Sequence, residues 1–161
     1  MKFFWLIIFV FSSINSVAEI IAVVDVNYLI NESNLGKKIN IDLQKKQDEI
    51  SKNLKNEEIK LKEKEKNLLS KKNILSNEEF SKEVNFLNNE FGNYNKNKNE
   101  KLANYEKYKR EKYSEFLQKL NKILADFSKQ NNIDMIMDKK NILIIKVDKD
   151  VTDRILEIID N

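Results

Sequence analysis

The 161-residue chain contains no cysteine, no histidine and no proline, and its only glycines are Gly36 and Gly92. Without cysteine it has no disulfides or thiol chemistry, and without histidine it lacks the usual acid/base residue at neutral pH and most zinc sites. An enzyme would have to work without most common catalytic groups, so we predict that the protein is not an enzyme and has no catalytic residue, metal site or cofactor. Because proline and glycine most often interrupt regular structure, their scarcity predicts long uninterrupted elements.

Charged residues make up 34% of the chain and apolar residues 41%, with a net charge of +3. The charged fraction exceeds the average of about 25% for globular domains, which is typical of long solvated helices or coiled coils. The length predicts about one domain. Little apolar material is left for a broad core.

Residues 1–18 have the layout of a secretory signal peptide. A short basic start, Met1-Lys2, precedes an unbroken apolar run from Phe3 to Phe11, and small residues lead up to Ala18. The run falls well short of the roughly 20 residues that span a bilayer, although an N-terminal membrane anchor stays open as an alternative. We predict cleavage after Ala18 and export of the mature protein, and no later segment is long and apolar enough to cross a membrane.

The middle of the chain carries the pattern of a long helical hairpin. Apolar residues recur every seven positions in its first half, at Leu54, Leu61, Leu68 and Leu75. This spacing is typical of a coiled coil, but most heptads hold only one strong apolar residue, so the predicted seam is thin. Ser76 followed by Glu79 is a capping-box signature. We therefore predict helices over residues 37–73 and 77–131, with the tip near residues 73–77.

Two apolar patches bracket this polar middle. Residues 20–26 predict a buried strand, followed by a short helical turn near Tyr28. At the other end, residues 133–137 and 142–147 predict two strands joined as a hairpin, with Asn141 able to take a positive φ in the turn. Asp150 or Thr152 should then cap a short C-terminal helix.

The predicted helix lengths separate an arm from a body. At 1.5 Å per residue the first helix is about 55 Å long and the second about 80 Å. Paired from the tip, they form an arm over residues 37–113. The second helix is longer, and its last part, residues 114–131, should pack into a body made of residues 19–36 and 114–161. The fold class is α+β and mainly α. Because three short strands leave exposed apolar edges, we expect oligomerisation.

Three stretches resemble the Skp/OmpH family of periplasmic chaperones for outer-membrane proteins. They are IAVVDVNYLI after the signal peptide, SNLGKK at the start of the long helix, and the closing NNIDMIMDKKNILIIKVDKDVTDRILEIID. The resemblance implies a homotrimer whose strands form a small β-barrel and whose helical arms enclose a cavity. It also implies an ATP-independent holdase that binds unfolded outer-membrane proteins in the periplasm.

Two sets of candidate site residues follow. The expected oligomerisation contacts are Ile20, Ala22, Val24, Ile133, Met135, Ile142 and Ile144. The expected client-facing residues of the arm are Lys64, Lys71, Phe86, Tyr105 and Tyr108. Basic stretches such as residues 60–72, with six lysines against two glutamates, would attract an anionic partner, including an anionic membrane surface, or serve only solubility.

Other interpretations remain open or are disfavoured. The main alternative function is a structural coiled-coil tether of the cell envelope. Nucleic acid binding is disfavoured because the aromatic residues lie mainly at seam spacing. Gly36-Lys37 is not part of a phosphate loop, because the earlier glycine that such a loop requires would be at position 31, which is asparagine. The asparagine-rich stretch with Gly92 predicts a weakened or bent segment over residues 91–99.

Overall fold

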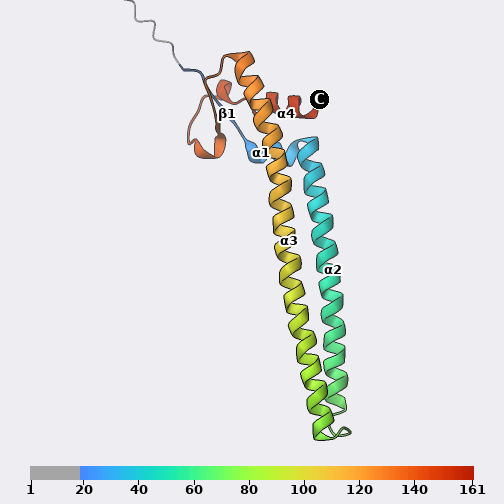
Figure 1. Cartoon of the computed structure of the whole chain (residues 1–161). Helices are drawn as coiled ribbons and strands as arrows, with labels where there is room; N and C mark the ends of the chain where they lie inside the picture. Colours follow the sequence, from blue (N-terminus) through green and yellow to red (C-terminus); the bar gives the residue numbers. More distant parts are fainter. Residues whose placement is uncertain (1–18) are drawn as a thin grey trace, which may run out of the picture.

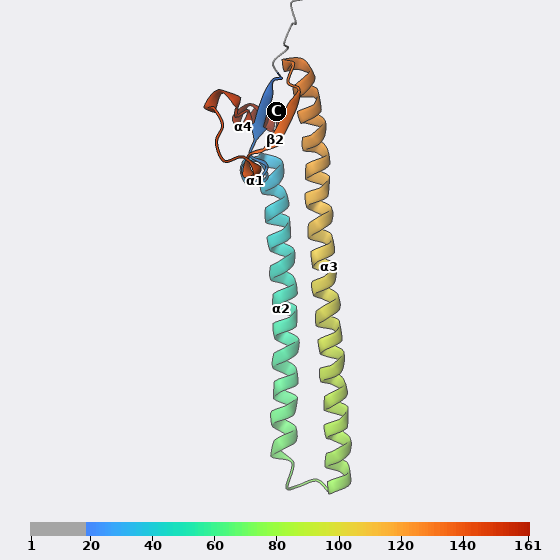
Figure 2. The same ribbon diagram turned by 90° about the vertical axis from the view of Figure 1, so that its left-hand side faces the viewer.

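The computed structural model describes residues 19–161, so the predicted signal peptide lies outside the described residues (Figure 1). The elements are β1 Ile21–Val24, α1 Val26–Glu32, α2 Asn34–Ser70, α3 Asn77–Asn131, β2 Met135–Asp138, the 3-10 turns η1 Lys139–Asn141 and η2 Val147–Lys149, and α4 Thr152–Asp160. Figure 2 shows α2 and α3 running antiparallel as a long arm, with the short elements gathered at the end opposite the tip. None of the helices in this part of the chain combines the length and apolar character that a membrane-spanning helix needs.

The second long helix begins and ends as the sequence predicts. Ser76 Oγ accepts a hydrogen bond from the Glu79 amide at 3.3 Å, and the Glu79 carboxylate accepts one from the Ser76 amide at 3.0 Å. This is the predicted capping box, and its side-chain and backbone hydrogen bonds from Ser76 lower the pKa of Glu79. At the other end Asn132 adopts a left-handed φ of 51° and donates its amide to the Ser128 carbonyl. The caps therefore fix both ends of α3.

The first long helix starts three residues earlier than predicted, at Asn34 instead of residue 37, and ends at Ser70. Ser33 is its N-cap, with Oγ accepting from the Gly36 amide at 3.1 Å. Gly36 thus lies in the first turn and does not break the helix. A Cβ at this glycine would lie 2.0 Å from the Ile30 carbonyl oxygen, so the chain passes from α1 into α2 with the two backbones in close approach.

The sheet differs from the predicted antiparallel hairpin. β1 and β2 pair in parallel, with Ile21 opposite Met135 and Val24 opposite Asp138. The other edge of β1 receives a hydrogen bond from the Val151 amide to the Val23 carbonyl at 2.9 Å. β1 therefore lies between two segments that follow it by more than a hundred residues.

The hairpin prediction fails at the turn and in its second strand. Residues 139–141 form a 3-10 turn because Asp138 accepts a hydrogen bond from the Lys140 amide at 3.2 Å. Asn132, and not Asn141, is the described non-glycine residue with positive φ. Residues 142–147 form no strand in this single chain, since neither β1 nor β2 pairs with them. The N-cap of α4 is Val151, and not Asp150 or Thr152.

Asp150 nevertheless organises the start of α4. Its carboxylate accepts hydrogen bonds from Lys139 Nζ at 2.6 Å and from the Thr152 amide at 3.0 Å. Thr152 Oγ1 in turn accepts from the Asp25 amide at 2.9 Å, at the end of β1. Burial opposes ionisation of Asp150, but the hydrogen bonds from Lys139 and Thr152 outweigh it, so its pKa lies below the ordinary value of 3.8.

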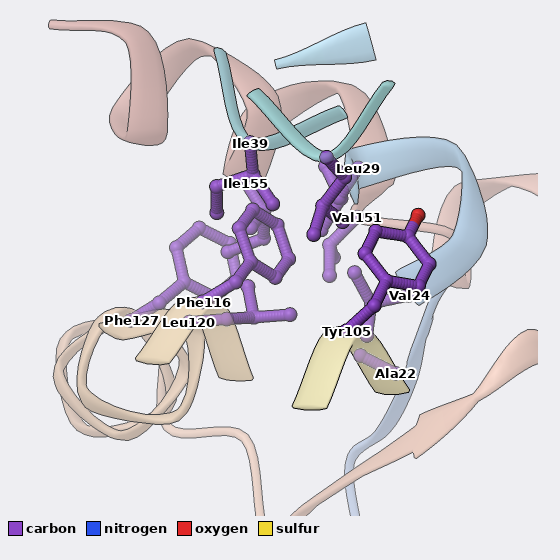
Figure 3. Close-up of a cluster of buried hydrophobic side chains, with 11 residues drawn as sticks. Ala22, Val24, Leu29, Ile39, Tyr105, Phe116, Leu120, Phe127, Val151 and Ile155 are labelled. Atoms are coloured by element: carbon purple, nitrogen blue, oxygen red, sulfur yellow. The ribbon is translucent and has the colours of Figure 1, made fainter. Parts of the chain in front are cut away.

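The core lies where the last third of α3 crosses the short elements. Figure 3 shows Phe116, Leu120 and Phe127 on α3 beside Ile155 of α4. The buried cluster also takes in residues of β1 and α1 and reaches the base of the arm, and it contains Ala22, Val24, Leu29, Ile39, Leu43, Tyr105 and Val151. Residues 114–131 thus contribute Phe116, Leu120 and Phe127 to this core.

The asparagine-rich segment does not interrupt α3, which stays helical through residues 91–99. Asn97 Nδ2 donates to Glu57 at 3.2 Å, and Lys101 Nζ contacts the same carboxylate at 3.0 Å. These contacts with α2 hold a stretch whose own helix propensity is low. That the stretch is weaker than its neighbours stays a prediction.

We expect the two glycines to respond in opposite ways to alanine. Gly36→Ala should destabilise the fold by about 3 kcal/mol or more, because the new Cβ would overlap backbone atoms of Ile30 that cannot move aside. A Cβ added at Gly92 would meet no heavy atom within 4 Å. Gly92→Ala should therefore stabilise the chain by about 0.5–1 kcal/mol, because alanine has the higher helix propensity. Urea unfolding of both variants measures the difference, and equal effects would contradict the close approach.

We also expect Asp150 to make the body sensitive to acid. Its pKa is lowered on folding, so its contribution to stability is present above the ordinary value of 3.8 and is lost as the pH falls through its lower folded value. Asp150→Asn should therefore destabilise the fold more at about pH 6 than at about pH 3. Asp126→Asn, which removes an exposed carboxylate of α3, is the control, and a gap that does not change with pH for Asp150→Asn would refute the assignment.

Candidate functional site

The two helices of the arm are held by few apolar side chains. Outside the core cluster, the buried apolar side chains of the arm are Leu54, Leu61 and Leu87. Between Leu87 and Tyr105, the apolar side chains of α3 are at most half-buried, as at Phe91 and Tyr94, and polar contacts also join the two helices. Lys101 Nζ lies 3.0 Å from Glu57, and Lys64 pairs with Glu90. The thin seam predicted from the heptads is confirmed.

A groove of about 460 Å³ runs between α2 and α3 near the tip. Leu68, Leu75 and Leu87 supply its apolar surface, and the first two are only half-buried. Phe86 lies at its side with 60% of the residue exposed. The groove exists because one apolar residue per heptad closes the seam between the helices only in part.

The two sides of the groove carry opposite charges. Lys64 of α2 and Lys71, the C-cap residue that follows α2, line one side, and the α3 side is lined by Glu79, Glu83 and Glu90. Lys64 and Glu90 form an ion pair between the sides, yet Glu90 Oε2 is buried without a hydrogen-bond partner. The lining therefore combines apolar surface with ammonium donors and carboxylate acceptors. Within residues 19–161, no cluster of three or more acidic residues is placed to hold a metal ion.

Three of the five predicted client-facing residues meet at this groove, namely Lys64, Lys71 and Phe86. The leucines and glutamates that line the groove beside them were not predicted as client-facing from the sequence. A signal was present, since lysines spaced by seven and glutamates spaced by four and seven fall on one side of their helices. The antiparallel register of the arm brings the two rows opposite each other.

The two predicted tyrosines lie elsewhere. Tyr105 is buried in the seam, with 9% exposed, and its hydroxyl donates to Gln47 at 3.4 Å. Tyr108 is half-buried and donates to Asp42 at 2.6 Å, a hydrogen bond that raises the pKa of the Tyr108 hydroxyl. Lys46 Nζ lies 4.8 Å from the centre of the Tyr108 ring. Neither tyrosine contributes to the groove, and Tyr105 is not accessible to a client here.

The predicted oligomerisation residues divide into two groups. Ala22 and Val24 are buried in the chain's own core, so they cannot contact a partner in this structure. Ile20, Met135 and Ile144 are exposed, and Ile133 and Ile142 are half-buried. Leu143 and Val147, which the sequence-based selection did not include, are exposed in the same segment as Ile144.

Comparison with known proteins identifies one family and one similar fold. A model of the OmpH-like outer membrane protein family matches residues 20–159. A crystal structure from Caulobacter crescentus CB15, described as a candidate outer membrane chaperone (OmpH-like), superposes with a TM-score of 0.81 over 89% of this chain and 85% of that one. At 15% identity, this likeness shows the fold alone. No curated protein matches the chain. Because the family match covers nearly all of the described residues, the chain belongs to the OmpH-like outer membrane protein family.

Proposed function

We propose that the protein is an ATP-independent holdase chaperone of the periplasm. It binds unfolded precursors of outer-membrane β-barrels and prevents their aggregation. The observation that carries the proposal is the arm itself, a solvated helical hairpin with a partly open apolar groove near its tip. Membership of the OmpH-like family supports it, as does the fold shared with the candidate chaperone from Caulobacter crescentus. Export through the predicted cleavage after Ala18 would bring the protein to the compartment that such precursors cross.

Holding without nucleotide requires only preferential binding to the unfolded precursor. Such binding lowers the concentration of free precursor by mass action, and folding at the membrane then competes for it. The lysine-rich stretches of the arm supply long-range attraction to anionic partners, including an anionic membrane surface, and this attraction weakens with salt. The precursor is released when its folded state becomes more stable than the complex.

The proposed assembly is a homotrimer whose strands form a small β-barrel and whose arms surround a cavity. Support comes from residues 142–147, where Leu143, Ile144 and Val147 are 101%, 93% and 90% exposed. A monomeric protein rarely leaves such a contiguous apolar segment in water. The segment is rich in β-branched residues and has no strand partner within one chain. Pairing with another copy would cover its side chains and satisfy its backbone.

We expect the mature protein to be a trimer that captures a single precursor. Native mass spectrometry of the protein, alone and after dilution of an unfolded outer-membrane barrel precursor into it, measures both properties. The expected masses are those of the trimer and of the trimer with one precursor. A monomer or dimer that leaves the precursor to aggregate would contradict the proposal and favour the envelope tether.

We further expect one substitution in the exposed segment to dissociate the trimer. Ile144→Asp would place an unpaired charge in the apolar interface, at a cost of about 2 kcal/mol or more per interface. The same change at Ile41, an exposed residue of α2, is the matched control and should leave the trimer intact. Native mass spectrometry reads the result, and a trimeric Ile144→Asp variant would exclude this segment from the interface.

A further inference from the structure

We infer that the groove near the arm tip binds an extended apolar segment of the precursor and holds its backbone between the lysine side and the glutamate side. The inference rests on the proposed function and names the surface that carries it. From Glu79 to Glu90 the groove follows eleven residue steps of α3, or about 16 Å at 1.5 Å per residue. An extended chain covers that distance with about five residues.

The apolar lining provides the attraction. Phe86 has 60% of its residue exposed, and the neighbouring Leu68 and Leu75 are half-buried. A side chain inserted between them would remove apolar surface on both partners from water, which is the main favourable contribution to such binding. Alternate side chains of an extended chain point the same way, so a segment of about five residues places two or three of them in the groove.

The charged sides suit a peptide backbone. An extended chain presents N–H and C=O groups along both of its edges. The ammonium groups of Lys64 and Lys71 can donate to carbonyls on one edge, and the carboxylates of the α3 side can accept from amides on the other. Because these contacts use the backbone, they do not depend on the sequence of the client.

The same charges disfavour other occupants. A uniformly anionic partner, such as a lipid surface or a nucleic acid, would lie along Glu79, Glu83 and Glu90. A uniformly cationic partner would meet Lys64 and Lys71 in the same way. A neutral extended segment suits both sides, and β-barrel strands, in which apolar residues alternate with polar ones, supply such segments.

Two alanine substitutions test the inference with matched exposure. Phe86 and Leu69 both lie near the tip with 60% of each residue exposed, but only Phe86 lines the groove. Phe86→Ala should weaken binding of the unfolded barrel precursor about tenfold, and Leu69→Ala less than about twofold. The dissociation constants are measured with the full mature protein, and circular dichroism verifies that each variant remains helical.

Cross-linking locates the contact independently. Because the chain has no cysteine, a single introduced cysteine can carry a photoreactive benzophenone at one defined place. Glu83→Cys puts the probe at the groove, and Ser81→Cys puts it about 200° around the helix. We expect a precursor cross-link from position 83 and little or none from position 81.

The outcomes separate this inference from the proposed function. Equal affinities of the Phe86 and Leu69 variants, with the wild type still binding precursor, would overturn the groove and leave the chaperone role in place. A cross-link from position 83 to another copy of the chain would also overturn it, in favour of an interface between arms. A wild-type protein that binds no precursor would overturn the proposed function and this inference together.

Discussion

The burial of Phe116, Leu120 and Phe127 is the interaction on which the rest of the structure depends. β1 and β2 have four residues each, and a pair of parallel strands this short is not stable by itself. It exists because the last third of α3 and the apolar side of α4 cover it. The same helix continues without a break into the arm. Arm and body therefore share α3 as one continuous element. The close approach at Gly36 sets how α2, the other helix of the arm, joins the body.

The arm is built with less apolar burial than the body, and this has two consequences. Partly exposed ion pairs such as Lys101 with Glu57 each contribute only about 0–1 kcal/mol, so the outer arm is held weakly and is more open to local fluctuation. The missing second apolar residue of each heptad also leaves Leu68 and Leu75 half-exposed. A seam with full heptads would be more stable, but its side chains would fill the groove. The low apolar content of the arm thus costs stability and leaves the groove partly open.

Local signals in the sequence predicted the helical hairpin of α2 and α3 well. Ser76 and Glu79 are three residues apart and cap each other, so their types alone located the start of α3. The parallel pairing of β1 with β2 could not be predicted from local signals, because the two strands are separated by more than a hundred residues. The turn residues after β2 favoured a β-hairpin instead. Residues 142–147 have strand-forming composition, but strand formation also needs a pairing partner. At the groove, the sequence indicated lysine and aromatic residues as candidate contacts. Which leucines and glutamates lie beside them depends on the register between α2 and α3, which the sequence did not reveal.

A single groove that contacts about five residues would bind weakly, and that suits the proposed holdase, which would release its client without ATP. If three arms surround one precursor, each bound segment raises the effective concentration of the other segments near the remaining grooves. The assembly then holds the chain tightly although each contact exchanges quickly. Folding of the precursor removes its extended segments one after another, and every loss weakens the remaining hold. Backbone contacts through Lys64, Lys71 and the glutamate side would extend this behaviour to clients of different sequence, because only an extended conformation and apolar side chains are required.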